Sequence, residues 1–356
     1  MDPKSRKKHS LNNQLFLITC LKSIILISRK RADRYEKFKI LKGLCYMRQV
    51  ERVRNFIVVG SLVVVLFWSL PSFGSSIDSK KYSRVIWSYL ETLCAFGPRN
   101  PGSEGYRATL DLIRREGQKY ADQVLEYPFL ARTSISSSQE MVNLELRFHG
   151  TQGGTPILIG THFDTRPFAD EDSNPEKLLE PIMGANDGGS GTAVLLGIAQ
   201  YLNQHPVARP VHLVFFDGED FGAKGSGLRL LGSTYYAQKL AQEERAKWPY
   251  WVLIIDMIGD KDLQIFKESY SLKGSSIFLD KIYRVAREKD LKSFKKKVKY
   301  TIYDDHYPFH LMGIPSTVLI DFDYPHWHTL ADTLDKCSVE SMFSVFSVVM
   351  KTIKDL

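Results

Sequence analysis

The chain has 356 residues, 44% of them hydrophobic, which is enough to bury the core of one large domain. Its formal net charge is +8, but residues 1–54 hold 15 basic and four acidic side chains, so the rest of the chain carries −3. A basic arm in front of an apolar run is typical of membrane targeting, and nucleic acid is excluded as the partner.

The apolar run Phe56–Leu70 contains no charged residue. It is shorter than the roughly 20 residues that a bilayer-spanning helix needs, and the small residues Ser72 and Gly74 behind it suit cleavage by signal peptidase. The run therefore predicts an export signal. An uncleaved membrane anchor is the alternative, and Met47 as the true start would give an ordinary signal peptide.

Three segments follow from this pattern: a basic arm (1–54), a signal peptide or signal-anchor helix (55–76) and a catalytic domain (80–356). We expect the protein to be exported to the periplasm or another extracytoplasmic space, with membrane contact only through its N-terminal segment. The domain contains Cys94 and Cys337. Two thiols make neither a disulfide framework nor a structural zinc site, so we expect buried free thiols, with a bridge between them as the alternative.

Within the domain, apolar spacing predicts helices over Val85–Cys94 and about Ser103–Tyr120, and alternation predicts a strand pair around Val124–Phe129 and Met141–Phe148. Continuously apolar strands follow at Pro156–Gly160, Val211–Phe216, Trp251–Ile255 and Ser316–Ile320. Helical stretches intervene near Gly191–Leu202, Ser233–Arg245 and Ser275–Asp290. This alternation predicts an α/β fold with a doubly wound, mixed β-sheet flanked by helices. The lysine-rich run Lys292–Lys299 is expected to be a solvated face before the next strand.

Acids or histidines follow each of the continuously apolar strands, where an open α/β sheet binds its ligands. These residues are His162 and Asp164, Asp217 to Asp220, Asp256, and His326 to His328. A further acid, Asp187, lies in the Gly-rich turn Gly184–Gly191 before a helix. Carboxylates together with imidazole are the ligands that Zn²⁺ takes when one coordination position must stay open for substrate. The pattern predicts a zinc-dependent enzyme.

The chain resembles the zinc aminopeptidase clan and, within it, the glutaminyl cyclases of bacterial type, from about Asn100 to Cys337. The matching stretches are Pro101–Ser103, His162–Asp170, Gly184–Gly188, Asp217–Asp220, Gly232–Ser233, Asp304–Phe309 and Trp327–Thr329. Their number and order make the resemblance specific.

The resemblance implies that Asp187, Asp220 and His328 bind zinc and that Glu219 is the acid/base. In the two-zinc aminopeptidases, the positions of His162 and Asp256 serve a second metal. All these positions are filled here, so ligand count leaves one zinc or two open. Asp164 and His162 are either second-metal ligands or residues that hold the ligands in place.

Three features favour a cyclase with one zinc per chain. Trp327 beside His328 suits an aromatic pocket for a glutamine side chain, Asp304 adds an acid before an Asp-His pair, and the stretch Arg166–Asp170 resembles the cyclases. Asp256 and Asp304 are then further catalytic residues, and Tyr324 joins Trp327 in binding substrate.

The expected activity is conversion of the N-terminal glutamine of peptides or proteins to pyroglutamate with release of ammonia, by a monomer. A two-zinc aminopeptidase that releases N-terminal residues is the alternative, with a metal-bound water as nucleophile and Glu219 as the general base. A catalytically dead ectodomain that binds partners is a third possibility, which the intact ligands and Glu219 disfavour.

Overall fold

Helices and strands alternate through the residues that a computed structural model describes, which are 77–222, 224–225, 227 and 229–356. The predicted basic arm (1–54) and export signal (55–76) lie outside these residues. In the part of the chain that is described, no helix is both long enough and apolar enough to cross a membrane.

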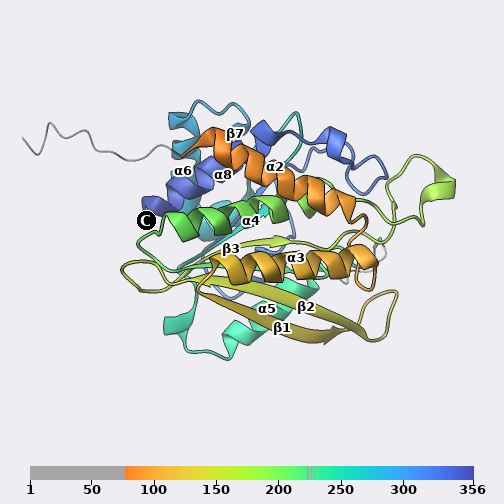
Figure 1. Ribbon diagram of the computed structural model, residues 1–356, viewed down its shortest axis with the longest axis horizontal. Coiled ribbons are helices and arrows are strands. Elements are labelled where there is room, and N and C mark those ends of the chain that lie inside the picture. The colour runs from red at the N-terminus through yellow and green to blue at the C-terminus, as the bar shows by residue number, and fades with distance from the viewer. Residues whose placement is uncertain (1–76, 223, 226, 228) are drawn as a thin grey trace, which may run out of the picture. The chain divides into compact units, whose positions relative to one another are not determined.

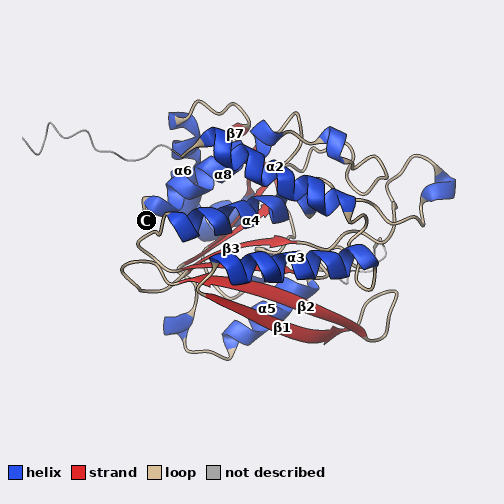
Figure 2. Cartoon of the chain, viewed as in Figure 1, coloured by secondary structure: helices blue, strands red, loops and turns tan. Residues whose placement is uncertain are grey.

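The described residues contain seven α-helices and eight strands. Figures 1 and 2 show how they are arranged. The helices are α2 (Ser79–Ala95), α3 (Glu104–Tyr120), α4 (Gly189–Gln204), α5 (Leu231–Ala241), α6 (Ser269–Glu288), α7 (Tyr307–Leu311) and α8 (Val339–Lys354). The strands are β1 (Gln123–Ala131), β2 (Gln139–Phe148), β3 (Ile157–His162), β4 (Val211–Phe216), β5 (Trp251–Asp256), β6 (Ile265–Glu268), β7 (Phe294–Tyr300) and β8 (Ser316–Ile320).

Six strands form the central sheet in the order β1-β2-β4-β3-β5-β8. The first three pair antiparallel, whereas β4, β3, β5 and β8 run parallel. From β3 the chain passes to β4 on one side, and from β4 it crosses over to β5 on the other. The carboxyl end of β3 therefore lies at the switch point of the sheet, where open α/β folds bind their ligands.

Helices cover both faces of this sheet (Figure 1). Ile157 and Ile159 of β3 face the larger core, with α2, α3, α4, α6 and α8, while Leu158 faces the smaller core with α5 and α7. Because successive side chains point to opposite faces, a strand covered on both sides must be apolar throughout. The predicted doubly wound α/β fold is confirmed.

The lysine-rich run is solvated, as predicted, but it is not a segment that precedes a strand. Residues Phe294–Tyr300 form a strand themselves, β7, which pairs in parallel with β6 in a separate two-stranded sheet. Lys296, Lys297 and Lys299 are exposed on it. A strand that is solvated on most of its surface has no apolar pattern, so the sequence could not show it.

Two helix boundaries also differ from the prediction. Helix α5 ends at Ala241, and Arg245–Lys247 forms a separate 3-10 turn. Helix α6 begins at Ser269 rather than at Ser275, where the backbone leaves the helical conformation (φ −148°, ψ 38°). The predicted start therefore coincides with a kink inside the helix.

Candidate metal centre

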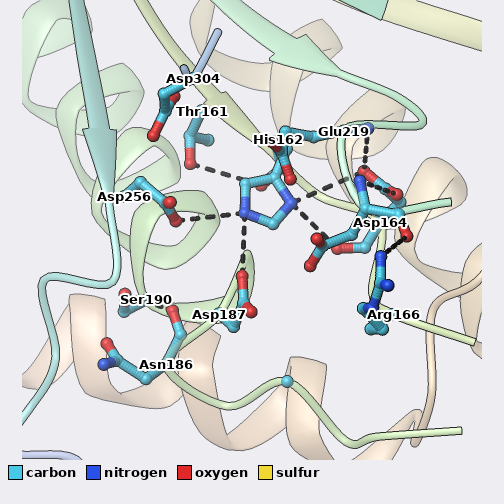
Figure 3. Close-up of polar contacts among 12 residues, drawn as sticks. Thr161, His162, Asp164, Arg166, Asn186, Asp187, Ser190, Glu219, Asp256 and Asp304 are labelled. Carbon is cyan, nitrogen blue, oxygen red and sulfur yellow. Dashed lines mark hydrogen bonds and ion pairs between the residues drawn. The ribbon is translucent and has the colours of Figure 1, made fainter. Parts of the chain in front are cut away.

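The predicted site residues come together at the carboxyl edge of the parallel strands (Figure 3). His162 is the last residue of β3 and Asp256 the last of β5. Asp220 lies in the turn after β4, Asp187 in the turn before α4, and His328 in the loop after β8. Parallel pairing brings these ends to one edge, although they lie far apart in the sequence.

Asp187, Asp220 and His328 form one group whose donor atoms all lie within 4.8 Å of one another. The His328 Nε2 atom is 3.1 Å from Asp220 Oδ1 and 3.6 Å from Asp187 Oδ2. All three side chains are buried, and the Oδ2 atoms of both aspartates have no hydrogen-bond partner among the described residues. Buried carboxylate oxygens without donors need a cation, so this group fits Zn²⁺.

His162, Asp187 and Asp256 form a second group with the same spacing. The His162 Nε2 atom lies 3.1 Å from Asp187 Oδ1 and 3.1 Å from Asp256 Oδ1. Asp187 belongs to both groups and faces both histidines. The donor geometry therefore accommodates either one ion or a pair that shares Asp187.

Two aspartates hold the donor residues without belonging to either group. Asp164 accepts hydrogen bonds from the backbone N–H groups of Glu219 (3.1 Å) and Asp220 (3.2 Å), which fixes the turn after β4. Asp170 lies 3.5 Å from Nδ1 of His328 and is bound by the Arg166 guanidinium. Of the two predicted roles of Asp164, the geometry gives it that of holding the ligands.

The Asp187 turn is fixed from behind by two buried charges. Asp332 accepts from the backbone N–H groups of Asn186 (2.8 Å) and Asp187 (3.1 Å). The fully buried Arg99 donates to the carbonyls of Phe163, Met183, Gly184 and Asp187. Neither Arg99 nor Asp332 was predicted. Each acts through backbone groups of distant segments, for which the sequence offers no signal.

Two backbone positions near the centre have a left-handed conformation. Gly188 has φ 71°, and a Cβ atom there would come within 2.6 Å of the Asp164 carbonyl oxygen. His328 has φ 55°, which is uncommon for a residue with a side chain. Strain of this kind persists where the surrounding contacts fix it, and here it aims the imidazole at Asp187 and Asp220.

Electrostatics at the centre follow from burial and from the density of carboxylates. Burial alone would lower the pKa of His328, but Asp220 and Asp170 outweigh it and raise the pKa to about 9. Burial and the Asp220 carboxylate raise the pKa of Asp187 to about 7. Protons shared among these carboxylates and imidazoles offset the negative charge of the cluster. A bound metal ion would supply that positive charge instead.

Glu219, the predicted acid/base, and Asp304, a further predicted catalytic residue, line the same cavity as these ligands. Burial and the Asp220 carboxylate raise the pKa of Glu219 well above its usual range. Burial and the Asp256 carboxylate do the same for Asp304. A raised pKa lets a carboxyl group hold a proton more readily, as a general acid must.

A cavity of about 390 Å³ opens onto these groups. Its polar lining includes Asp187, Glu219, Asp220, Asp256, Asp304 and His328, and its apolar lining includes Met257, Ile302, Ile320, Phe322 and Trp327. The Trp327 ring stacks on that of His328 with centroids 3.9 Å apart, and Phe322 packs against it. The cavity therefore places acids, the candidate metal group and an aromatic wall around one small volume.

The prediction that Tyr324 binds substrate is not upheld. Tyr324 is buried, does not line this cavity, and donates its hydroxyl hydrogen to Asp332 Oδ1 at 2.7 Å. It belongs to the contacts that fix the Asp187 turn. Cys94 and Cys337 are both buried free thiols, as expected.

Comparison with known proteins identifies the family that has this arrangement of residues. Residues 143–353 match the sequence profile of Peptidase family M28. The chain belongs to this family. Family M28 is an enzyme family that depends on zinc, in agreement with the donor groups described above.

Curated M28 relatives include both activities that the sequence suggested. Aminopeptidase YwaD of Bacillus subtilis is 25% identical over 270 residues, covering 72% of this chain and 53% of the relative. A glutaminyl-peptide cyclotransferase of Boiga dendrophila is 24% identical over 228 residues, covering 54% of this chain and 60% of the relative. The chain thus spans less than two thirds of these relatives.

Solved M28 structures are covered almost completely. The glutaminyl cyclases of Tannerella forsythia and Fimbriiglobus ruber are each 27% identical, with TM-scores of 0.71 and 0.72. A Zn-dependent exopeptidase of Parabacteroides distasonis is 25% identical with a TM-score of 0.71. The matches cover 77% of this chain and 98%, 95% and 98% of those chains.

Proposed function

We propose that this M28 enzyme is a glutaminyl-peptide cyclotransferase that converts N-terminal glutamine to pyroglutamate with one zinc ion. The observation that carries the proposal is Asp304. It is a buried carboxyl group that belongs to neither donor group described above. It is also outside the third possible group in the described residues, which consists of His162, Glu219 and Asp220, yet it lines the same cavity as Glu219 and Trp327. Peptide hydrolysis by two metal ions has no evident need for such an acid.

Ring closure requires the α-amine of the substrate to attack its own γ-carboxamide carbon and release ammonia. Zinc held by Asp187, Asp220 and His328 would polarise the γ-carbonyl. Glu219 accepts a proton from the attacking amine and transfers it to the departing nitrogen, so that C–N bond formation and cleavage balance.

The other cavity residues orient the substrate and exclude water. Asp256 and Asp304, which line the same cavity as the candidate zinc ligands, bind the carboxamide nitrogen and hold it in the folded conformer. Trp327 and Phe322 wall the pocket, which limits attack by water. Because both reacting groups belong to one substrate, conformer selection supplies much of the rate enhancement.

A zinc aminopeptidase is the second candidate, and the completeness of the His162, Asp187 and Asp256 group favours it. That group would hold a second ion, and Glu219 would serve as general base for water attack on a peptide carbonyl. The exopeptidase and the aminopeptidase among the relatives agree with this alternative.

The cellular setting is a proposal from the sequence alone. We infer that the chain is exported, to the periplasm or a similar compartment, because the basic arm and the run Phe56–Leu70 have the order of an export signal. Peptides or proteins with N-terminal glutamine would be its substrates, and a monomer would suffice because the described residues contain all the groups that the mechanism uses.

The deciding experiment offers the purified protein glutaminyl-β-naphthylamide and leucyl-p-nitroanilide. A cyclase forms pyroglutamyl-β-naphthylamide and ammonia and leaves the arylamide bond intact. Free arylamine without pyroglutamate would reject the cyclase in favour of the aminopeptidase. Metal analysis accompanies the assay, and close to two zinc ions per chain would contradict the one-zinc proposal.

Single substitutions in the cavity test the roles proposed for individual residues. Glu219→Gln should keep its zinc and lose at least about 100-fold in kcat, because general acid–base catalysis typically contributes that much. Asp220→Ala should lose both zinc and activity. Glu171→Gln is the matched control, because Glu171 lines the rim of the same cavity, paired with Lys224 at 2.6 Å, and should stay active. An active Glu219→Gln enzyme would show that the acid/base is assigned wrongly.

A further inference from the structure

A second depression, of about 530 Å³, adjoins the candidate active-site cavity. It lies between α5 and α7, and its lining residues are Gly227, Arg229, Leu230, Thr234, Ala237, Gln238, Ala241, Tyr303, Tyr307, Pro308, Leu311 and Met312. We call it the α5/α7 groove. Nothing in the mechanism above uses it.

The two helices give the groove a more polar side, from α5, and an apolar side, from α7. Thr234, Gln238 and Ala241 are spaced so that they share one face of α5, and all three are exposed. Opposite them, Leu311 of α7 is 68% exposed, next to the half-buried Met312. Thr234 and Ala241 are small, which leaves room beside them for a peptide to lie against the apolar wall formed by α7.

Tyr303 connects the groove to the cavity. Tyr303, Gly227 and Arg229 line both depressions, so the two adjoin at these residues. Tyr303 also directly precedes Asp304, the acid on which the proposed function depends.

The Tyr303 ring is fixed in this position although it is 47% exposed. It packs edge-on against Tyr307 with ring centroids 4.7 Å apart. Its hydroxyl lies 3.2 Å from that of Tyr270 on α6, so the two are hydrogen-bonded. A preorganised aromatic surface binds a ligand at a lower entropic cost than a mobile one.

We infer that the α5/α7 groove binds the residues that follow the N-terminal residue of the substrate and selects peptides with apolar side chains there. The inference rests on the proposed function for the identity of the first residue, glutamine. A peptide whose first residue fills the cavity must leave it through an opening, and the groove adjoins the cavity at Tyr303, Gly227 and Arg229. Leu311 and Tyr303 supply apolar contacts, while Thr234 and Gln238 offer hydrogen-bonding groups to a peptide backbone.

The test measures steady-state kinetics on three substrates: glutamine amide, Gln-Gly-Gly-amide and Gln-Leu-Phe-amide. We expect kcat/KM to be about 10-fold higher for Gln-Leu-Phe-amide than for Gln-Gly-Gly-amide, because burying one apolar side chain strengthens binding by about that factor. The difference should lie in KM, because these contacts are the same in the ground and transition states.

Two variants alter the groove from opposite sides. Leu311→Ser removes an apolar contact, and Ala241→Trp fills the space from α5. Each should raise KM for Gln-Leu-Phe-amide about 5- to 10-fold and leave glutamine amide unchanged. Ile277→Ser is the matched control, since Ile277 is 80% exposed on α6 and lines neither depression.

The outcomes separate the groove from the reaction. Pyroglutamate formation at equal rates from Gln-Leu-Phe-amide and Gln-Gly-Gly-amide would show that the groove inference is wrong, while the proposed function stands. The same conclusion holds if the groove variants keep the wild-type preference for Gln-Leu-Phe-amide. If only Leu-p-nitroanilide is cleaved, the proposed function fails, and the same peptides beginning with leucine test the groove.

For a protein without either activity, calorimetry with the zinc-loaded enzyme compares binding of Gln-Leu-Phe-amide and Gln-Gly-Gly-amide. Equal affinity for the two peptides there would reject the groove, and about 10-fold tighter binding of the first would uphold it.

Discussion

His328 is held at both ring nitrogens. Nε2 faces Asp220 and Asp187, and Nδ1 lies 3.5 Å from Asp170, which is itself bound by Arg166. A carboxylate on the second ring nitrogen of a ligating histidine fixes the tautomer and the ring orientation, and removing it typically costs 10- to 100-fold in metal affinity or activity.

We therefore predict that Asp170→Asn weakens zinc binding about 10- to 100-fold. Competition with a chelator, followed by metal analysis, measures this directly. The control is Glu180→Gln, which removes one negative charge from an exposed position in the following loop. Zinc affinity equal to that of the wild type in Asp170→Asn would show that Asp170 does not orient His328.

The candidate metal ligands could be read from the sequence because each stands next to a strong pattern. His162 and Asp256 end continuously apolar strands, and Asp187 sits in a Gly-rich turn before a helix. Arg99 could not be found this way, since a lone arginine in a Pro- and Gly-rich loop looks solvent-exposed. It is buried only because four distant carbonyls converge on it.

At the scale of elements, the N-terminus of α6 depends on a buried carboxylate. Glu268 accepts from the backbone N–H groups of Tyr270 (2.8 Å), Ser271 (2.7 Å) and Ile302 (3.2 Å), and lies 3.3 Å from Nε2 of His306. Burial alone would raise its pKa, but His306 and the backbone donors lower it from 4.5 to about 2. The charged form is therefore more stable in the folded state.

We predict that Glu268→Gln destabilises the protein by about 3 kcal/mol at pH 7. The wild-type contribution is fully present above the unfolded pKa of 4.5 and is lost as the pH falls towards about 2, so the difference should narrow below pH 4.5. Urea denaturation at pH 7, 5, 4 and 3 measures it. Asp280→Asn, an exposed charge on α6 paired with Lys267, should change stability by less than about 1 kcal/mol. A difference that stays constant down to pH 3 would contradict the assigned cause.

Helices and strands could be predicted from the sequence where burial gives their apolar residues a regular spacing. The β1/β2 hairpin and the four parallel strands follow from alternation and from continuous apolar runs. Helix α8 was not predicted, because Phe343 to Met350 is almost continuously apolar and suits a buried helix or a buried strand equally. Strand β7 was not predicted for the opposite reason: it contains four lysines and lacks the buried face that would give an apolar pattern.

At the scale of the whole molecule, two residues before position 80, the predicted start of the domain, contact the folded part. Asp78 caps α2 by accepting from the backbone N–H of Lys81 at 3.0 Å, and Ile77 packs against the larger core. A chain that starts at residue 80 lacks both contacts. Loss of an N-cap typically costs about 1 kcal/mol.

We predict that a protein of residues 77–356 folds and binds zinc, and that one of residues 80–356 melts about 2–4 °C lower. Thermal unfolding followed by circular dichroism compares them. Asp78→Ala in the longer protein should reproduce most of the loss. Identical melting temperatures for the two proteins would mean that neither Ile77 nor Asp78 contributes to the domain.

Helix α4 runs from the candidate metal centre to the far end of the domain. Gly189, two residues after Asp187, begins it, and after about 24 Å it ends near the start of α2, where Lys81 Nζ lies 2.5 Å from Gln204 Oε1. The end of α8 meets the same region, since Lys354 contacts Tyr201. A resin, bead or carrier protein joined at residue 77 or 356 would therefore lie about one helix length from the substrate entrance, and the immobilised catalyst should process bulky proteins as readily as the free one.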